Sequence, residues 1–298
     1  MADGMVALPG GEFRMGSDRF YPEEAPVAVV RVDGFELDRH AVTNEDFGRF
    51  VEVTGHVTLA ERSLDPATFS EALPSYEPGS LVFSPTAGPV DLADWRQWWR
   101  WIPGADWRHP RGPGSSLDGL DRHPVVQIAY ADAAAFAAWA GKRLPTESEW
   151  EYAARGGLDG ATFAWGEEPN GPEHLSANTW QGAFPYRNLG ANGWVGTAPV
   201  GSFPPNGYGL FEMTGNTWEW TADYWADRRV PDAVDGCTCS PQDPRGASVA
   251  RGELVPRRVL KGGSHLCAPE YCLRYRPAAR SPQAEDSATT HIGFRCAR

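Results

Sequence analysis

The stretch from residue 259 to residue 280 restricts the local fold most strongly, because a proline lies between its two cysteines. Cys267 and Cys272 are separated by four residues. On a regular helix, which turns roughly 100° per residue, their side chains would point to different faces. Pro269 also argues against an uninterrupted helix across the pair. If the two sulfur atoms meet, they therefore meet across a bent loop.

A converged thiol pair allows three interpretations: a structural disulfide, a redox-active dithiol, or a two-thiolate site for a soft ion such as Cu(I). Zinc needs further ligands, and no second matched cysteine pair lies at a suitable distance. Glycines that let the backbone lie close to a partner, followed by a run of arginines, suit an open site better than a core disulfide. These flanking residues are Gly262, Gly263, Ser264, Arg274, Arg276 and Arg280.

Composition indicates a loop-rich globule and not a helix bundle. The 298 residues include 33 glycines, 26 prolines and 13 tryptophans, so aromatic packing has to hold many irregular segments together. One large domain is compatible with this length. The formal net charge of −12 argues against a nucleic-acid partner, because phosphate binding requires a basic patch.

The sequence shows no sign of export or membrane insertion. No basic segment followed by an apolar one stands at the N-terminus, and no apolar run approaches the roughly 18 residues of a membrane span. Five cysteines, an odd number, do not resemble a disulfide framework. We therefore expect a cytoplasmic protein in a reducing compartment, without a membrane partner.

Local patterns in the first part of the chain predict a hairpin and a helix. Residues 27–37 alternate in polarity on either side of Asp33 and Gly34, a pair typical of hairpin turns. Thr43 can cap a helix that ends at Gly55.

The clearest secondary-structure signals lie between residues 123 and 157. Residues 123–128 resemble a strand, and the alanine-rich residues 131–140 resemble a helix. Thr146 and Glu149 form a capping box that opens another helix, and Gly156 is positioned to end it.

The remaining segments are expected to be irregular. Residues 163–225 are interpreted as loops, and residues 226–258 as a surface insertion in which Cys237 and Cys239 are incidental exposed thiols. A cluster of tryptophans is assigned mostly to the core, because clustered tryptophan is more often core than an exposed binding wall. Its members are Trp95, Trp98, Trp99, Trp101 and Trp107.

Three motifs closely resemble the aerobic formylglycine-generating enzymes, and the resemblance extends over nearly the whole chain. It implies a single compact mixed α+β domain over residues 1–298, loop-rich and related to C-type lectins, with little regular secondary structure. The motifs are Gly-Lys-Arg-Leu-Pro-Thr-Glu from residue 141, Gly-Gly-Ser-x-x-Cys-x(4)-Cys-x-Arg-Tyr-Arg from residue 262, and Gly-Phe-Arg-Cys from residue 293.

The resemblance also implies a reaction. A cysteine in a Cys-x-Pro-x-Arg motif of a sulfatase would be oxidised by O₂ to Cα-formylglycine. Cu(I) held by Cys267 and Cys272 would be the cofactor. The partner would be an unfolded or nascent sulfatase chain, and the enzyme would act as a monomer.

Four further residues are candidates for the same site. Ser264 could hydrogen bond oxygen species or water near the copper, or be an ordinary turn serine. Trp218 could form the wall of the site on the side where O₂ binds, although a buried tryptophan usually serves only in packing. Tyr271 could orient the substrate sulfur. His291 stands where relatives place asparagine. It could be a proton-carrying group near the site, but we favour a plain surface histidine.

Two calcium sites are implied by the same resemblance, built from carboxylate, amide and main-chain oxygens. Asn192 departs from the family, in which an acid is usual, and this weakens the first site. Ordinary turn residues are the alternative for both sets. The first set is Asn178, the carbonyl of Thr179, Asn192 and the carbonyl of Trp194. The second set is Glu212, the carbonyls of Gly215 and Thr217, and Glu219.

Two other functional classes are compatible with parts of this sequence. A non-catalytic, C-type-lectin-like binding module would keep the fold motifs but typically lack the cysteine pair. A thiol-disulfide protein would use the pair for redox chemistry without copper. Some relatives carry disulfide cysteines near Ala154 and Pro277, so Cys296 lacks its partner here, which fits a reducing compartment.

Overall fold

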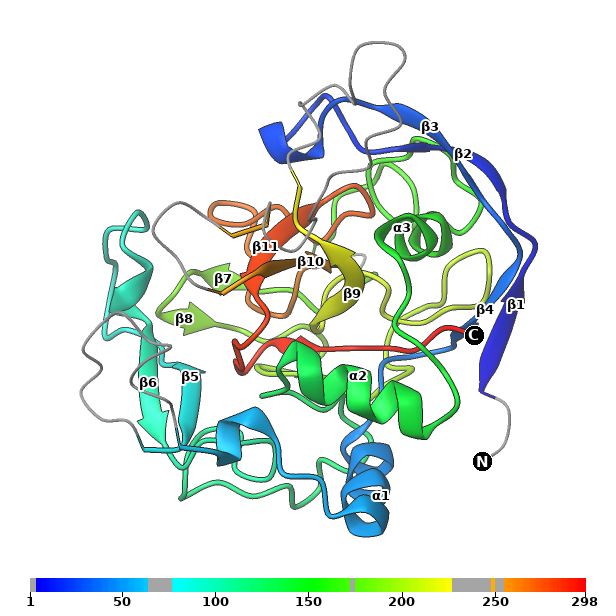
Figure 1. Cartoon of the computed structure of the whole chain (residues 1–298). Coiled ribbons are helices and arrows are strands. Elements are labelled where there is room, and N and C mark those ends of the chain that lie inside the picture. The colour runs from blue at the N-terminus through cyan, green and yellow to red at the C-terminus, as the bar shows by residue number, and fades with distance from the viewer. Residues whose placement is uncertain (1–3, 64–76, 172–174, 227–247, 250–254) are drawn as a thin grey trace.

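A four-stranded mixed sheet lies at the centre of the computed structural model, which describes residues 4–63, 77–171, 175–226, 248–249 and 255–298 (Figure 1). Its strand order is β11-β10-β9-β12, with β9 and β11 antiparallel to β10 and β12 parallel to β9. The strands are β9 (Trp218–Tyr224), β10 (Arg257–Lys261), β11 (Arg280–Ala284) and β12 (Ile292–Gly293).

The register of this sheet brings distant parts of the sequence to one of its ends. Lys261 at the end of β10 lies opposite Glu219 near the start of β9 and opposite Arg280 at the start of β11. In the neighbouring pair, Ile292 lies beside Trp218. The segments around residues 218, 262, 279 and 291 therefore meet at the same sheet end.

The N-terminal residues form a long two-stranded ribbon and not the predicted hairpin. Strand β1 pairs with β4 and β2 pairs with β3, so β3 and β4 run in the same direction along the ribbon. Gly10 lies so close to Asp33 that an added Cβ would be 2.5 Å from the Asp33 carbonyl carbon. The breaks between β1 and β2 and between β3 and β4 therefore lie side by side in the ribbon. The strands are β1 (Met5–Leu8), β2 (Gly11–Met15), β3 (Ala28–Val32) and β4 (Phe35–Asp38).

All three predicted helices are present, with the predicted caps on two of them. The Thr43 hydroxyl accepts a hydrogen bond from the Asp46 amide, and Gly55 ends the helix in the left-handed conformation. Thr146 and Glu149 make the capping box. The helices are α1 (Asn44–Thr54), α2 (Tyr130–Trp139) and α3 (Glu147–Arg155).

One strand assignment and one loop assignment from the sequence are wrong. Residues 123–128 form only an isolated bridge at Pro124, since Gln127 adopts a φ of 62° that interrupts an extended run. Residues 218–224, predicted as loop, form β9 in the central sheet. The shorter elements are η1 (Pro22–Glu24), η2 (Leu59–Glu61), η3 (Trp95–Gln97), β5 (Gly79–Phe83), β6 (Trp99–Pro103), β7 (Gly182–Ala183) and β8 (Arg187–Asn188).

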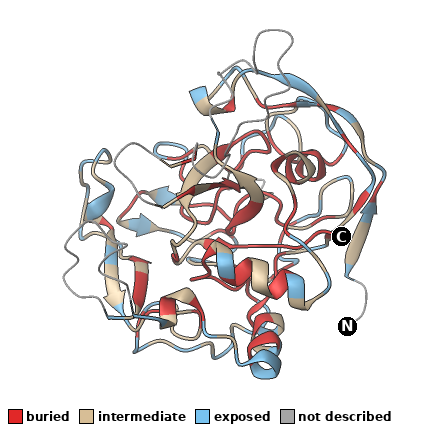
Figure 2. Cartoon of the chain, in the orientation of Figure 1, coloured by how far each residue is buried: buried red, intermediate tan, exposed pale blue. Residues whose placement is uncertain are grey.

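Aromatic side chains pack the core on both sides of the sheet end, and Figure 2 shows buried residues concentrated along the sheet and α3. One cluster joins α1, α2 and the central sheet, and another joins Trp98, Trp180, Phe184 and Leu266. Trp98 is buried as predicted, whereas Trp95 is 50% exposed. Within the described ranges, no helix is long and apolar enough to cross a membrane. The predicted insertion at 226–258 and its cysteines lie almost entirely outside these ranges.

Candidate active site

The cysteine-bearing loop joins β10 to β11 and folds back on itself through two glycines. At Gly263, with a φ of +69°, an added Cβ would lie 2.8 Å from the Tyr275 amide nitrogen. At Gly262, with a φ of +98°, it would lie 2.9 Å from the Met213 carbonyl oxygen. Any side chain at these positions would push the loop apart. The close backbone approach expected from the sequence is therefore present.

The two sulfur atoms meet across this bent loop. Cys267 Sγ and Cys272 Sγ are 2.9 Å apart, well beyond the disulfide bond length of about 2.05 Å, and both thiols are free. The Cys267 amide donates to the Ser264 carbonyl at 2.9 Å, and the Cys272 amide donates to the Ala268 carbonyl at 2.6 Å. These turns point both side chains inward, where they are 2% and 9% exposed.

The two thiols differ in pKa. A hydrogen bond from Cys267 lowers the pKa of Cys272 to about 7, against the effect of burial and with help from the positive charge of Arg274. Burial and the hydrogen bond to Cys272 raise the pKa of Cys267 well above its ordinary value. Near neutral pH Cys272 is therefore about half ionised, whereas Cys267 keeps its proton.

The thiols line a cavity of about 160 Å³ that contains all six residues predicted for the catalytic and cofactor site. Tyr271 stacks on Phe184, with ring centroids 4.5 Å apart, and stays 36% exposed at the rim. Ser264 is buried, and its hydroxyl accepts a hydrogen bond from the Leu266 amide, so it both shapes the turn and faces the cavity. The six are Ser264, Cys267, Cys272, Trp218, Tyr271 and His291.

The expectation that His291 is a plain surface histidine is wrong, because His291 lines the thiol cavity. Its Nδ1 lies 2.7 Å from the Thr289 hydroxyl, and its ring packs against Trp99 with centroids 4.8 Å apart. Burial lowers the pKa of His291 to about 3, so the imidazole is neutral at physiological pH.

Half of the cavity wall was not predicted. Trp98, Trp99 and Phe184 come from segments far from the cysteines in sequence, and only their aromatic character hinted at a role. Sequence reasoning assigned the tryptophans to the core, and Trp98 belongs to both core and wall. The wall residues outside the predicted six are Trp98, Trp99, Phe184, Leu266, Arg274 and Ser281, of which the sequence had singled out only Arg274 as a flanking residue of an open site.

Comparison with known proteins identifies the family of this chain. The family described as "Sulfatase-modifying factor enzyme 1-like domain" matches residues 1–298. The chain belongs to this family. It is 58% identical to the formylglycine-generating enzyme of Mycobacterium tuberculosis, over 98% of this chain and 96% of that one. It is 46% identical to the formylglycine-generating enzyme of Thermomonospora curvata, over 100% and 94%.

A solved structure supports the fold of this chain. PvdO from Pseudomonas aeruginosa matches with a TM-score of 0.63 and 26% identity, covering 99% of this chain and 93% of that one. The loop-rich mixed α+β architecture expected from the sequence is confirmed by this match and by the element content.

The first predicted calcium set keeps an unused oxygen. Asn178 is buried, and its Oδ1 has no hydrogen-bond partner, while its Nδ2 donates to the Gly196 carbonyl and to Asn216. Gly196 follows the turn that carries Asn192 and Trp194, in which the Trp194 carbonyl accepts a hydrogen bond from the Ala191 amide at 3.1 Å. A buried amide oxygen without a donor suits a hard cation.

The second calcium set fits a cation poorly. Both Glu219 oxygens accept hydrogen bonds from Arg295, and one also accepts from the Trp150 indole. The Glu212 oxygens accept from the Gly201 and Phe203 amides. Arg295 already supplies the positive charge that calcium would bring, so these residues do not fit a calcium site.

A larger groove adjoins the thiol cavity of this enzyme. Its volume is about 790 Å³, it shares Leu266 with the thiol cavity, and Pro110 and Trp180 are among its lining residues. The described lining of both cavities contains no aspartate or glutamate.

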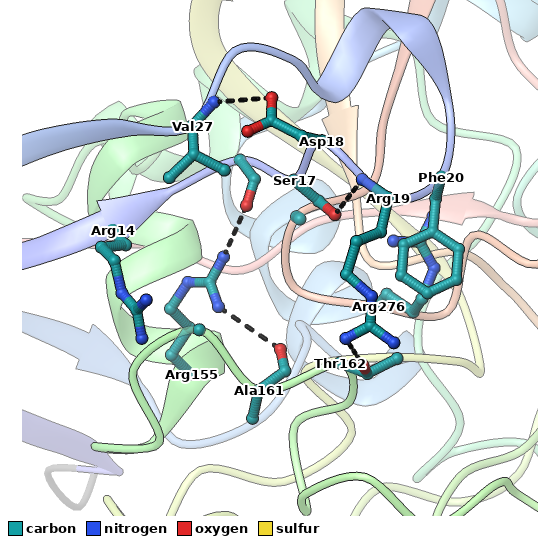
Figure 3. Close-up of a pocket in the computed structure, with 13 residues that line it drawn as sticks. Arg14, Ser17, Asp18, Arg19, Phe20, Val27, Arg155, Ala161, Thr162 and Arg276 are labelled. Carbon is teal, nitrogen blue, oxygen red and sulfur yellow. Dashed lines mark hydrogen bonds between the residues drawn. The ribbon is translucent and has the colours of Figure 1, made fainter.

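A further cavity, of about 230 Å³, is lined by several arginines, and Figure 3 shows Arg155 hydrogen bonded to the Ala161 carbonyl. Arg155 binds the Glu151 carboxylate at 2.7 Å and the Gly16 carbonyl at 3.2 Å. Arg276 pairs with Glu24. The fold thus compensates these buried charges, and the cavity is not a candidate active site.

Proposed function

We propose that the thiol cavity is where this formylglycine-generating enzyme oxidises a sulfatase cysteine, with Cys267 and Cys272 holding Cu(I). The conversion of a sulfatase cysteine to formylglycine is supported by the 58% and 46% identity to relatives named formylglycine-generating enzyme. The observation that carries the assignment to this cavity is the pair of free thiols, 2.9 Å apart, at the bottom of an aromatic pocket. The Cys-x-Pro-x-Arg form of the substrate motif is part of the proposal.

The donor set fits a soft monovalent ion. Thiolates select Cu(I) among the common metals. In the described part of the chain, no group of three or more His, Cys, Asp or Glu side chains is placed to hold a metal, so a zinc site with several such ligands is not supported. When bound, Cu(I) would supply the one-electron chemistry with O₂ that protein side chains lack.

The cavity walls would exclude water and orient the substrate cysteine. Trp218 and the stacked Tyr271–Phe184 pair provide apolar surface around the sulfurs. Burial raises the pKa of Tyr271 to about 12, so its hydroxyl keeps its proton and can donate to a substrate sulfur. His291, neutral and fixed by Thr289, can hydrogen bond without adding charge. The substrate cysteine loses one hydrogen from Cβ and one from sulfur to give a thioaldehyde, and O₂ takes up these two electrons and two protons. Water then adds to the thioaldehyde carbon, and the sulfur leaves as hydrogen sulfide to give the aldehyde.

The proposal is tested by incubating the protein with Cu(I), O₂ and a Cys-x-Pro-x-Arg peptide. We expect mass spectrometry to show conversion of the cysteine to the aldehyde, and copper omission or chelation to stop it. A matched Ser-x-Pro-x-Arg peptide should stay unchanged. Turnover that is unaffected by rigorous copper removal would contradict the copper assignment.

Thiol-disulfide exchange is the second candidate, favoured by a thiol with a pKa of about 7 beside a resolving thiol. It predicts reversible oxidation of the pair and no aldehyde. The peptide experiment therefore separates the two functions directly.

We further propose that Asn178 binds a structural Ca²⁺ together with the Thr179 carbonyl, Asn192 and the Trp194 carbonyl. At a Ca²⁺ concentration about a hundred times the dissociation constant, binding would stabilise the fold by roughly 2.7 kcal/mol. We expect thermal unfolding to shift upward with Ca²⁺ and back with a chelator, and Asn178→Ala to abolish the shift. Asn206→Ala, whose amide is fully hydrogen bonded, should keep it. No shift in the wild type would contradict this site.

A further inference from the structure

Arg274 carries the only permanent charge among the described residues that line the thiol cavity. Its side chain is 26% exposed, so part of the guanidinium is withdrawn from water. The neighbouring walls are aromatic and aliphatic, apart from the thiols, two serines, a tyrosine and a neutral histidine. Negative charge on the sulfurs therefore has one cation within the cavity to compensate it.

The N-terminal part of the chain holds this guanidinium in place. Arg274 Nη2 donates to Glu23 Oε1 at 2.8 Å, and the guanidinium carbon lies 3.9 Å from the Tyr21 ring centroid. The Tyr21 hydroxyl accepts a hydrogen bond from the Leu273 amide at 3.0 Å. Tyr21 and Glu23 thus fix both the backbone and the side chain of a loop about 250 residues away in sequence.

One donor of Arg274 is left over in this arrangement. Its Nε is buried and has no hydrogen-bond partner, although Nη2 is engaged by Glu23. A buried, unused N–H on a permanent cation is costly unless an anion or acceptor takes it. The sulfurs in the same cavity are the anionic groups available to it.

The chemistry of the site creates such an anion. Two thiolates around a monovalent ion leave one negative charge, and a substrate thiolate would add a second. In a cavity walled by aromatic rings, these charges are poorly solvated. A fixed cation beside the sulfurs offsets that penalty without taking part in electron transfer.

We propose that Arg274 is the counter-cation of the sulfur site and that Glu23 is the residue that positions it. The substrate part of this inference rests on the proposed function, because it is the entering substrate cysteine that adds the second negative charge. The inference assigns a role to the N-terminal segment Tyr21–Glu23, which does not itself line the thiol cavity.

The positive potential at the sulfurs can be measured without copper, O₂ or substrate. Cys272 is alkylated with anionic iodoacetate and with neutral iodoacetamide at one pH, and both rates are read by mass spectrometry of the tryptic peptide that contains it. Because the same thiolate attacks both reagents, their rate ratio reports the local charge and not the fraction ionised. We expect Arg274→Gln to lower the iodoacetate-to-iodoacetamide ratio about three- to tenfold.

Matched variants separate the two halves of the proposal. Arg274→Lys keeps the charge and should retain most of the ratio. Glu23→Gln should lower the ratio, because Arg274 loses its anchor. A higher ratio in Glu23→Gln would show that Glu23 only neutralises the arginine, which overturns the positioning role. The exposed Arg49–Glu45 pair on α1 provides the controls Arg49→Gln and Glu45→Gln, which should leave the ratio unchanged.

Cu(I) affinity gives the second readout, by anaerobic competition with a chromophoric Cu(I) chelator. We expect Arg274→Gln to weaken Cu(I) binding at least about fivefold. If the wild type binds no Cu(I), the copper proposal fails, while the alkylation ratio still decides the role of Arg274. An unchanged ratio in Arg274→Gln would overturn the counter-cation role even if the enzyme proves to be copper-dependent.

Discussion

Replacing either Cys267 or Cys272 with serine is expected to lower peptide turnover by at least about a hundredfold, and the double variant should be little worse. The two sulfurs act as one unit at 2.9 Å, so removing one leaves a single thiolate that cannot hold a soft ion in the same way. Serine is close in size to cysteine, so the buried loop should still fold. Initial rates of aldehyde formation measured by mass spectrometry, together with Cu(I) stoichiometry, give the test.

Cys296 provides a matched control for these variants. It is a free and fully buried cysteine, like the pair, but it packs in the core cluster around Phe47 and Phe294 and does not line the thiol cavity. We expect Cys296→Ser to retain activity within about twofold per folded molecule. Near-wild-type turnover in Cys267→Ser or Cys272→Ser would rule out a two-thiolate site.

The part of the site that is continuous in sequence was predictable, and the part assembled by folding was not. Ser264, Cys267, Tyr271 and Cys272 lie within nine residues, so their convergence needs only a bent loop. Trp218 and His291 were named through the family resemblance, and the sheet register explains why they reach the same cavity.

Phe184 and Glu23 could not be found in this way. The contacts that bring them to the loop depend on the whole fold, and neither residue lies near the cysteines in the sequence. His291 was misjudged for a related reason, because burial is set by its neighbours Thr289 and Trp99 and not by its own polarity.

The same distinction between local and long-range causes explains the fold predictions. Helices α1 and α3 were predicted together with their ends, because capping by Thr43 and Thr146 is decided within a few residues. Strand β9 was missed because its regularity comes from pairing with β10 and β12, each more than thirty residues away. Strand propensity depends on such context more than helix propensity does.

Replacing Arg295 with methionine is expected to cost about 3–5 kcal/mol of unfolding free energy, because it leaves the buried Glu219 carboxylate without its cation. The two side chains are 0% and 1% exposed, and the Arg295 guanidinium binds both Glu219 oxygens, at 2.7 and 2.8 Å. Trp150 completes this group with an indole hydrogen bond to the same carboxylate at 2.8 Å. Denaturant unfolding followed by tryptophan fluorescence measures the loss.

An exposed arginine three residues further on gives the comparison for this variant. Arg298 pairs with Glu36 at 2.7 Å, but the two side chains are 51% and 38% exposed, so Arg298→Met should cost less than about 1 kcal/mol. The difference between the two losses of unfolding free energy tests whether the burial of Arg295, and not the ion pair as such, makes this residue important. Because Glu219 directly follows Trp218, which lines the thiol cavity, a Glu219 carboxylate without its cation would disturb the site as well as the core. Equal costs for Arg295→Met and Arg298→Met would contradict this account of the sheet end.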